Sequence, residues 1–104
     1  MHVYVGRVSD YDKAADAVDH ASGTPLYVQL ADIIARKIDA GELAPDRPIP
    51  AETRMAEEYG VARLTARRAV RELRERGLVR TVQGKGTFVL ARRADDTASD
   101  QGDS

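Results

Sequence analysis

The sequence lacks cysteine, and its two histidines, His2 and His20, both lie in the N-terminal stretch. The absence of cysteine excludes a disulfide framework and a cysteine-ligated metal site. With so few histidines, we expect neither a histidine metal site nor a histidine-based catalytic pair, and we expect no cofactor. No run approaches 18 apolar residues, which argues against a membrane span.

The N-terminal stretch also lacks the features of a secretory signal peptide. Residues 1–21 contain four aspartates and no apolar block, whereas a signal peptide needs a continuous apolar segment. We therefore expect a cytoplasmic protein. The 104 residues are enough for one domain. A composition of 42% hydrophobic and 32% charged residues suits a globular domain with a heavily charged surface.

Basic residues are concentrated in one part of the chain, although the formal net charge is only −1. Residues 54–93 contain eleven arginines or lysines and four glutamates, a net charge of +7, whereas residues 1–53 and 94–104 each carry a net charge of −4. A concentrated basic surface is typical of proteins that bind the phosphates of nucleic acids. Because arginine-rich helices are often simply solvated, charge alone leaves both interpretations open.

Both ends of the chain differ from its middle. We expect residues 1–23 to form an extension that is at most partly ordered, with a weak helix signal over residues 13–20. Turn-forming residues 22–25 mark the boundary. Residues 92–104 are small, polar and acidic, so we expect a disordered tail there. The folded domain should therefore span residues 24–91.

The middle of the chain predicts three helices, over about residues 25–40, 51–59 and 63–76. Thr24 is the expected N-cap of the first, with Pro25 at its first helical position and Gly41 as its stop. The expected core faces are Leu26, Leu30, Ile33, Ile34 and Ile38; Met55, Ala56 and Tyr59; and Ala66, Ala69, Val70 and Leu73. The segment between the first two helices contains too much proline to be helical.

The short connections after the second helix define the fold class. Only residues 60–62 separate the second helix from the third, and a three-residue turn with a glycine is the helix-turn-helix connection. Residues 78–82 and 87–90 are rich in β-branched side chains and predict two strands joined by a tight turn at residues 83–86. The sequence therefore predicts an α+β winged helix-turn-helix, in which three helices precede a two-stranded β-hairpin wing.

The start of the third helix carries the residues expected to contact DNA. A helix fits the major groove, where base edges differ in their donors and acceptors, and arginine can bind guanine bidentately. Arg68 and Arg71 stand four residues before an acid, at Glu72 and Glu75, and can form local pairs instead. Arg63 and Arg67 have no acid at that spacing and are the better candidates for base contacts.

Two further features of the predicted interface have ordinary alternatives. Leu64 should face outward, where it can contact a thymine methyl group, although an exposed leucine is common without any function. At the wing, Gly84 and Gly86 flank Lys85, so the backbone can approach a phosphate closely while lysine supplies charge. Many hairpin turns have this composition, and its position after the third helix is what favours the DNA interpretation.

These residues resemble the DNA-binding domain of the GntR family of bacterial transcription regulators. The resemblance covers about residues 24–90. Its motifs are Pro25-Leu26-Tyr27 with Gln29, Gly41-Glu42-Leu43 with Pro45, Ile49-Pro50-Ala51-Glu52, Gly60-Val61, Arg63, Thr65, Arg67, Ala69, Leu73, Gly77-Leu78 and Gly84-Lys85-Gly86-Thr87-Phe88-Val89.

The resemblance implies a repressor that binds a palindromic double-stranded DNA operator as a homodimer. The DNA contacts that it implies lie at Arg63, Leu64, Thr65 and Arg67, and at Gln83 and Gly84 of the wing, beside Lys85. The family often has arginine after Glu52, where this chain has Thr53 followed by Arg54. Family members usually carry a residue with a hydroxyl group at the positions that open the second and third helices. This chain has Ala51 and Ala62 there, and the side chain of alanine cannot cap a helix.

Most family members carry an effector-binding domain after the DNA-binding domain, whereas here about 14 polar residues follow Leu90. We therefore expect no small-molecule ligand, and dimerisation through the N-terminal extension or the first helix. A protein-interaction subunit, or an accessory DNA-binding module regulated by a partner chain, is the alternative. No nucleophile–base pair or metal-ligand spacing is present in the sequence, so we expect no enzyme activity.

Overall fold

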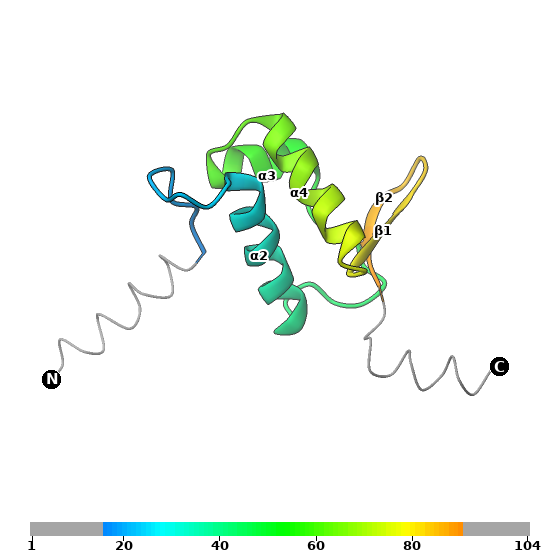
Figure 1. Ribbon diagram of the computed structural model, residues 1–104. Helices are drawn as coiled ribbons and strands as arrows, with labels where there is room; N and C mark the ends of the chain where they lie inside the picture. The colour runs from blue at the N-terminus through cyan, green and yellow to red at the C-terminus, as the bar shows by residue number, and fades with distance from the viewer. Residues whose placement is uncertain (1–15, 91–104) are drawn as a thin grey trace, which may run out of the picture.

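A computed structural model describes residues 16–90 as three helices followed by a β-hairpin (Figure 1). The elements are α2 (Leu26–Asp39), α3 (Glu52–Tyr59), α4 (Arg63–Glu75), β1 (Val79–Val82) and β2 (Gly86–Val89). The two strands pair antiparallel, with Val79 opposite Val89. This arrangement confirms the predicted winged helix-turn-helix. The disordered tail predicted for residues 92–104 and the first part of the N-terminal extension lie outside the described residues.

The start of α2 differs from the prediction by one residue. Pro25, with a ψ of 143°, occupies the N-cap position, and no side chain caps the helix. The carbonyl of Pro25 accepts the first helical hydrogen bonds, from the amides of Val28 and Gln29 at 3.1 Å each. The prediction that Thr24 caps this helix is therefore wrong. The carbonyl of Thr24 instead accepts a hydrogen bond from Nε2 of Gln29 at 2.7 Å.

Residues 16–23 fold back along α2 in turns and bends, so the helix suggested for residues 13–20 is absent over residues 16–20. Gln29 holds this segment in place. Its Oε1 accepts a hydrogen bond from the amide of Asp19 at 2.7 Å, and its Nε2 donates to the carbonyl of Asp19 at 3.1 Å. Val18 packs against the core. The Nζ of Lys37 lies 3.9 Å from Oδ2 of Asp16.

The hydrophobic core lies where α4 packs against α2 and α3. The predicted inward residues of α4 are buried, and Ala66, Ala69 and Leu73 are fully buried. Their partners include Leu30 and Ile34 of α2, both of which belong to the same buried cluster. Leu26 is only half-buried, because it lies in the first turn of α2 at the edge of this core. The helical periodicity of the sequence therefore identified the buried face of α4.

A double ion pair joins the end of α4 to α2. Nη2 of Arg76 lies 2.9 Å from Oδ1 of Asp32, and Nε of Arg76 lies 2.9 Å from Oε2 of Glu72. The hydrogen bond to Glu72 raises the pKa of the Arg76 guanidinium, partial burial opposes this, and Asp32 adds to the rise. Glu72 is thus engaged by Arg76, and the local pair of Arg68 with Glu72 that the spacing allows is not formed.

The proline-containing segment before α3 runs along the free edge of β2. The amide of Ile49 donates to the carbonyl of Thr87 at 2.8 Å, and the amide of Val89 donates to the carbonyl of Arg47 at 2.9 Å. Pro48 forms an isolated antiparallel bridge with Phe88. Because this backbone pairing satisfies both sides of β2, it fixes the wing against the helical part of the domain.

Burial of Leu73 is expected to be essential for stability. Replacing Leu73 with alanine should lower the free energy of unfolding by about 2–5 kcal/mol, since the side chain is fully buried and its removal leaves a cavity. Leu64→Ala is the matched control on the same helix, because Leu64 is exposed, and should change stability by less than about 0.5 kcal/mol. Urea unfolding measures both, and equal losses would contradict the described packing.

Candidate nucleic-acid interface

The turn between α3 and α4 sets the direction in which α4 leaves the core. Gly60 adopts the left-handed conformation, with a φ of 67°, and follows the last residue of α3. The amide of Val61 then donates to the carbonyl of Ala56 at 3.0 Å, which closes α3. Ala62 is the N-cap of α4, so three residues, 60–62, separate the end of α3 from the start of α4. This is the compact connection of a helix-turn-helix.

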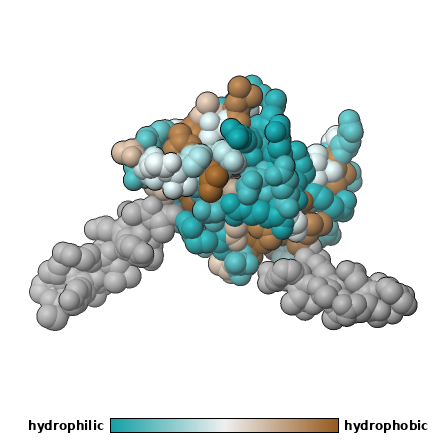
Figure 2. Space-filling model, in the orientation of Figure 1, coloured by the Kyte–Doolittle hydropathy of each residue, from teal (hydrophilic) through white to brown (hydrophobic). Residues whose placement is uncertain are grey.

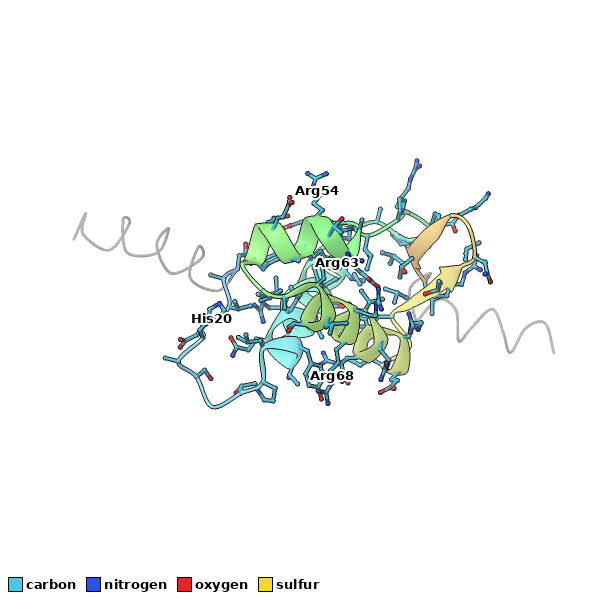
Figure 3. The ribbon with its side chains drawn as sticks, turned by 90° about the horizontal axis from the view of Figure 1, so that it is seen from above. His20, Arg54, Arg63 and Arg68 are labelled. Carbon is cyan, nitrogen blue, oxygen red and sulfur yellow. The ribbon has the colours of Figure 1, made fainter. Side chains whose placement is uncertain are left out.

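The first two turns of α4 present the predicted contact residues to solvent. Arg63, Leu64, Arg67 and Arg68 are exposed, and Thr65 is half-buried. Figure 3 shows Arg63 at the start of α4, with Arg54 extending outward from α3 on one side and Arg68 on the other side, next to α2. The structure therefore arranges these arginines as a band across the domain rather than as a single cluster.

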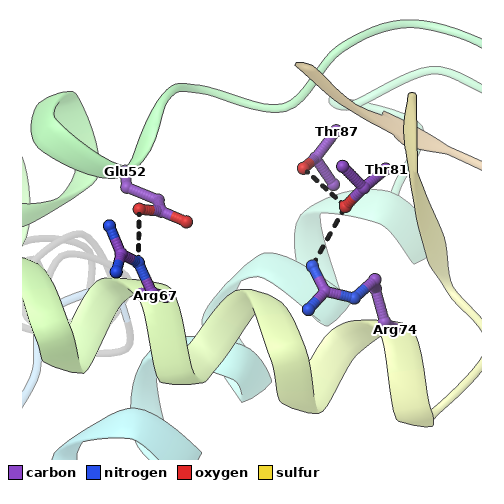
Figure 4. Close-up of polar contacts among 5 residues, drawn as sticks. All are labelled: Glu52, Arg67, Arg74, Thr81 and Thr87. Atoms are coloured by element: carbon purple, nitrogen blue, oxygen red, sulfur yellow. Dashed lines mark hydrogen bonds and ion pairs between the residues drawn. The ribbon is translucent and has the colours of Figure 1, made fainter. Parts of the chain in front are cut away.

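Arg67 forms an ion pair with a residue outside its own helix. Its Nε lies 3.2 Å from Oε1 of Glu52, which belongs to the first turn of α3 (Figure 4). Both side chains are partly exposed, so the pair contributes little to stability. Its effect is to hold the Arg67 guanidinium beside α3. Glu52 lies 15 residues before Arg67 and in another helix, so residue spacing within α4 gives no sign of this partner.

Arg68 stacks on an aromatic ring of α2. Its guanidinium carbon lies 4.1 Å from the centre of the Tyr27 ring, a distance at which the positive charge is attracted by the face of the ring. The stacked guanidinium keeps its N–H groups at the edge of its plane, where they can bind a phosphate. The contact therefore orients Arg68 without excluding it from an interface with an anion.

Three predicted segments meet around one hollow beside the wing. Arg63 of α4, Thr53 of α3, and Lys85 and Gly86 of the hairpin all line this hollow, whose volume is about 390 Å³. Two positively charged side chains from different elements thus border the same opening. Arg54 does not line it and projects from α3 in another direction (Figure 3).

The wing is a tight hairpin that is tied to α4. Gly84 and Gly86 have φ values of 80° and 128°, which other residues rarely adopt, and the amide of Lys85 donates to the carbonyl of Val82 at 2.9 Å. Nη1 of Arg74 donates a hydrogen bond to Oγ1 of Thr81 at 3.0 Å. The Oγ1 atoms of Thr81 and Thr87 lie 3.3 Å apart across the hairpin (Figure 4). Gln83 and Lys85 remain exposed at the turn.

The surface of the domain is predominantly hydrophilic on the face seen in Figure 2, with small separate hydrophobic groups. Within residues 16–90, no helix is long and apolar enough to cross a membrane, and no three His, Cys, Asp or Glu side chains gather as a metal-ligand group. The exposed face of α4, the three-residue turn and the anchored hairpin define a winged helix-turn-helix DNA-binding domain.

Sequence comparison identifies the family. The family described as "Bacterial regulatory proteins, gntR family" matches residues 26–89, and the chain belongs to this family. It is 39% identical over 72 residues to the HTH-type transcriptional repressor NagR of Bacillus subtilis (strain 168), covering 69% of this chain and 30% of NagR. It is 44% identical over 69 residues to MngR of Escherichia coli (strain K12), the mannosyl-D-glycerate transport/metabolism system repressor, covering 66% of this chain and 29% of MngR.

Solved structures show the same fold bound to DNA. The DNA-binding domain of AraR in complex with operator ORX1 superposes with a TM-score of 0.65 and 35% identity, covering 70% of this chain and 93% of that one. The chain spans less than a third of the length of NagR and MngR. The similarity is therefore to the DNA-binding domains of these regulators.

Substitution of Ala62 tests whether the missing side-chain cap at the start of α4 lowers the stability of the domain. Its φ of −69° and ψ of 152° are those of an N-cap, yet alanine provides no oxygen to the free amides of α4. Ala62→Thr should therefore raise the free energy of unfolding by about 1 kcal/mol. Ala62→Val has nearly the same shape without the hydroxyl and should give no such gain. Urea unfolding of both variants checks this, and equal stabilities would contradict it.

Proposed function

We propose that this protein binds an operator sequence in double-stranded DNA and represses transcription. The observation that carries the proposal is the shared hollow where Arg63 of α4, Thr53 of α3 and Lys85 of the wing meet. An interface of this kind can contact base edges and the phosphate backbone at once. The named functions of NagR and MngR as repressors, and the operator complex of AraR, support the same proposal.

The proposed roles follow from side-chain chemistry. Arg63 and Arg67 bind guanine edges in the major groove, because a guanidinium can donate two hydrogen bonds to O6 and N7. Glu52 positions Arg67 for this contact through their 3.2 Å ion pair. Arg54 and Arg68 bind phosphates on either side of the α4 axis. These phosphate contacts set the position of the protein on DNA without selecting a sequence.

The remaining predicted residues extend the same surface. Thr53 and Thr65 supply hydroxyl groups near the starts of α3 and α4, where they can donate to phosphates. At the wing, Gln83 and Lys85 reach the adjacent backbone or minor groove, and the absence of side chains at Gly84 and Gly86 permits close approach. A band from α3 to the wing therefore forms one continuous interface.

The proposal includes a symmetric arrangement on DNA. Two copies bind the half-sites of a palindromic operator about one helical turn apart, so that both α4 helices enter the same face of the duplex. In a bacterium the operator lies in the cytoplasm, and the protein acts there.

The first test is selection of duplexes from a random-sequence pool, followed by affinity measurement with the selected DNA. Arg63→Ala should weaken binding about 10–100-fold and relax the preference at one base pair, which corresponds to about 1–3 kcal/mol for a bidentate contact. Arg36→Ala removes the same charge from the last turn of α2, at the opposite end of the domain from the start of α4 (Figure 1), and should have a small effect. Failure to enrich any sequence, or equal effects of the two variants, would refute the proposal.

Lys85 should behave differently from Arg63. Lys85→Ala is expected to weaken binding to all duplexes uniformly and to lower the slope of log affinity against log salt concentration by about 1, because one phosphate contact and its released counterion are lost. Titrations at several salt concentrations measure this slope, with Lys85→Arg as the charge-retaining control. A change in sequence preference without a change in slope would contradict the assigned role.

A further inference from the structure

Leu64 is the one large hydrophobic residue among those the structure describes that is strongly exposed, at 70%. Exposure of a single leucine carries no function by itself. Leu64, however, lies in the first turn of α4, directly after Arg63. The apolar side chain is therefore placed on the surface that the proposed function assigns to DNA.

The outward side of α4 consists of two stripes with different neighbours. Residues four apart lie one above the other on a helix, so Arg63 and Arg67 form one stripe, and Leu64 and Arg68 form the other. The first stripe faces α3 and the wing, since Arg63 borders the wing hollow and Arg67 pairs with Glu52. The second stripe is turned toward the start of α2, where Arg68 stacks on Tyr27.

The second stripe borders its own shallow hollow of about 350 Å³. This hollow is lined by Pro25, Leu26, Tyr27, Leu64, Thr65 and Arg68. Its surface combines apolar groups with the guanidinium of Arg68. Figure 3 shows Arg68 on the α2 side of α4. An apolar surface beside a positive charge suits a ligand that presents a methyl group next to a phosphate.

In the major groove, thymine presents such a group, because its C5-methyl projects from the base edge while the other bases show polar atoms there. We infer that Leu64 selects a T·A base pair by contact with the thymine methyl group, while Arg68, held by Tyr27, binds the neighbouring phosphate. This inference rests on the proposed function. It assigns guanine recognition to the Arg63 stripe and thymine recognition to the Leu64 stripe.

The test removes only the methyl group. The full chain is used to select an operator from a random-sequence duplex pool, and each thymine of the selected duplex is replaced in turn by uracil. At one position in each half-site, uracil should weaken binding by the wild-type protein about fourfold, the effect of exposing one methyl-sized group. Leu64→Ala should bind the thymine and uracil duplexes equally, and Leu64→Met should retain the difference.

Arg71→Ala is the matched control, because Arg71 is exposed on α4 seven residues after Leu64 and so lies on nearly the same side. This variant should bind both duplexes more weakly and keep the fourfold ratio. If no sequence is enriched, the proposed function itself fails. If the wild-type protein binds the selected duplex but no uracil substitution weakens binding, or Leu64→Ala keeps the ratio, the inference is overturned and the proposed function stands.

Discussion

The packing of α4 between α2 and α3 is the constraint on which the rest of the structure depends. Ala66 and Ala69 are fully buried and small, so neighbouring helices can approach α4 closely, and Leu73 fills the space nearer the wing. Because this side of α4 is committed to the core, the opposite side must face solvent. Burial of an apolar stripe therefore determines where Arg63 and Leu64 are presented, and the interface is a consequence of the core.

The wing depends on a second constraint, which is backbone pairing. The segment before α3 bonds to one edge of β2, while β1 bonds to the other. Because both edges are satisfied, the hairpin cannot easily swing away from the helices, and the bond from Arg74 to Thr81 adds a direct link to α4. This rigidity keeps Lys85 near the hollow that Arg63 borders. Base contacts and backbone contacts are thus held in fixed relative positions.

The sequence predicted the features that depend on local periodicity or on a single residue type. The buried face of α4 followed from its helical spacing, and the turn at Gly60 followed from the conformational freedom of glycine. Contacts between distant segments leave no such pattern. The Glu52–Arg67 ion pair and the pairing of Ile49 with Thr87 therefore went unpredicted. The N-cap was wrongly predicted at Thr24 because threonine, a residue type that often caps helices, lies one position before the observed N-cap.

Methylation interference on a selected duplex shows directly whether α4 recognises base edges in the major groove. Methylation of guanine N7 adds a group in the major groove at the atom that an arginine would bind. If α4 recognises base edges, this modification should block binding at guanines in each half-site, and Arg63→Ala should abolish the interference at one of them. Interference confined to adenine N3 in the minor groove, or identical patterns for the variant and the wild-type protein, would contradict the claim that α4 recognises base edges.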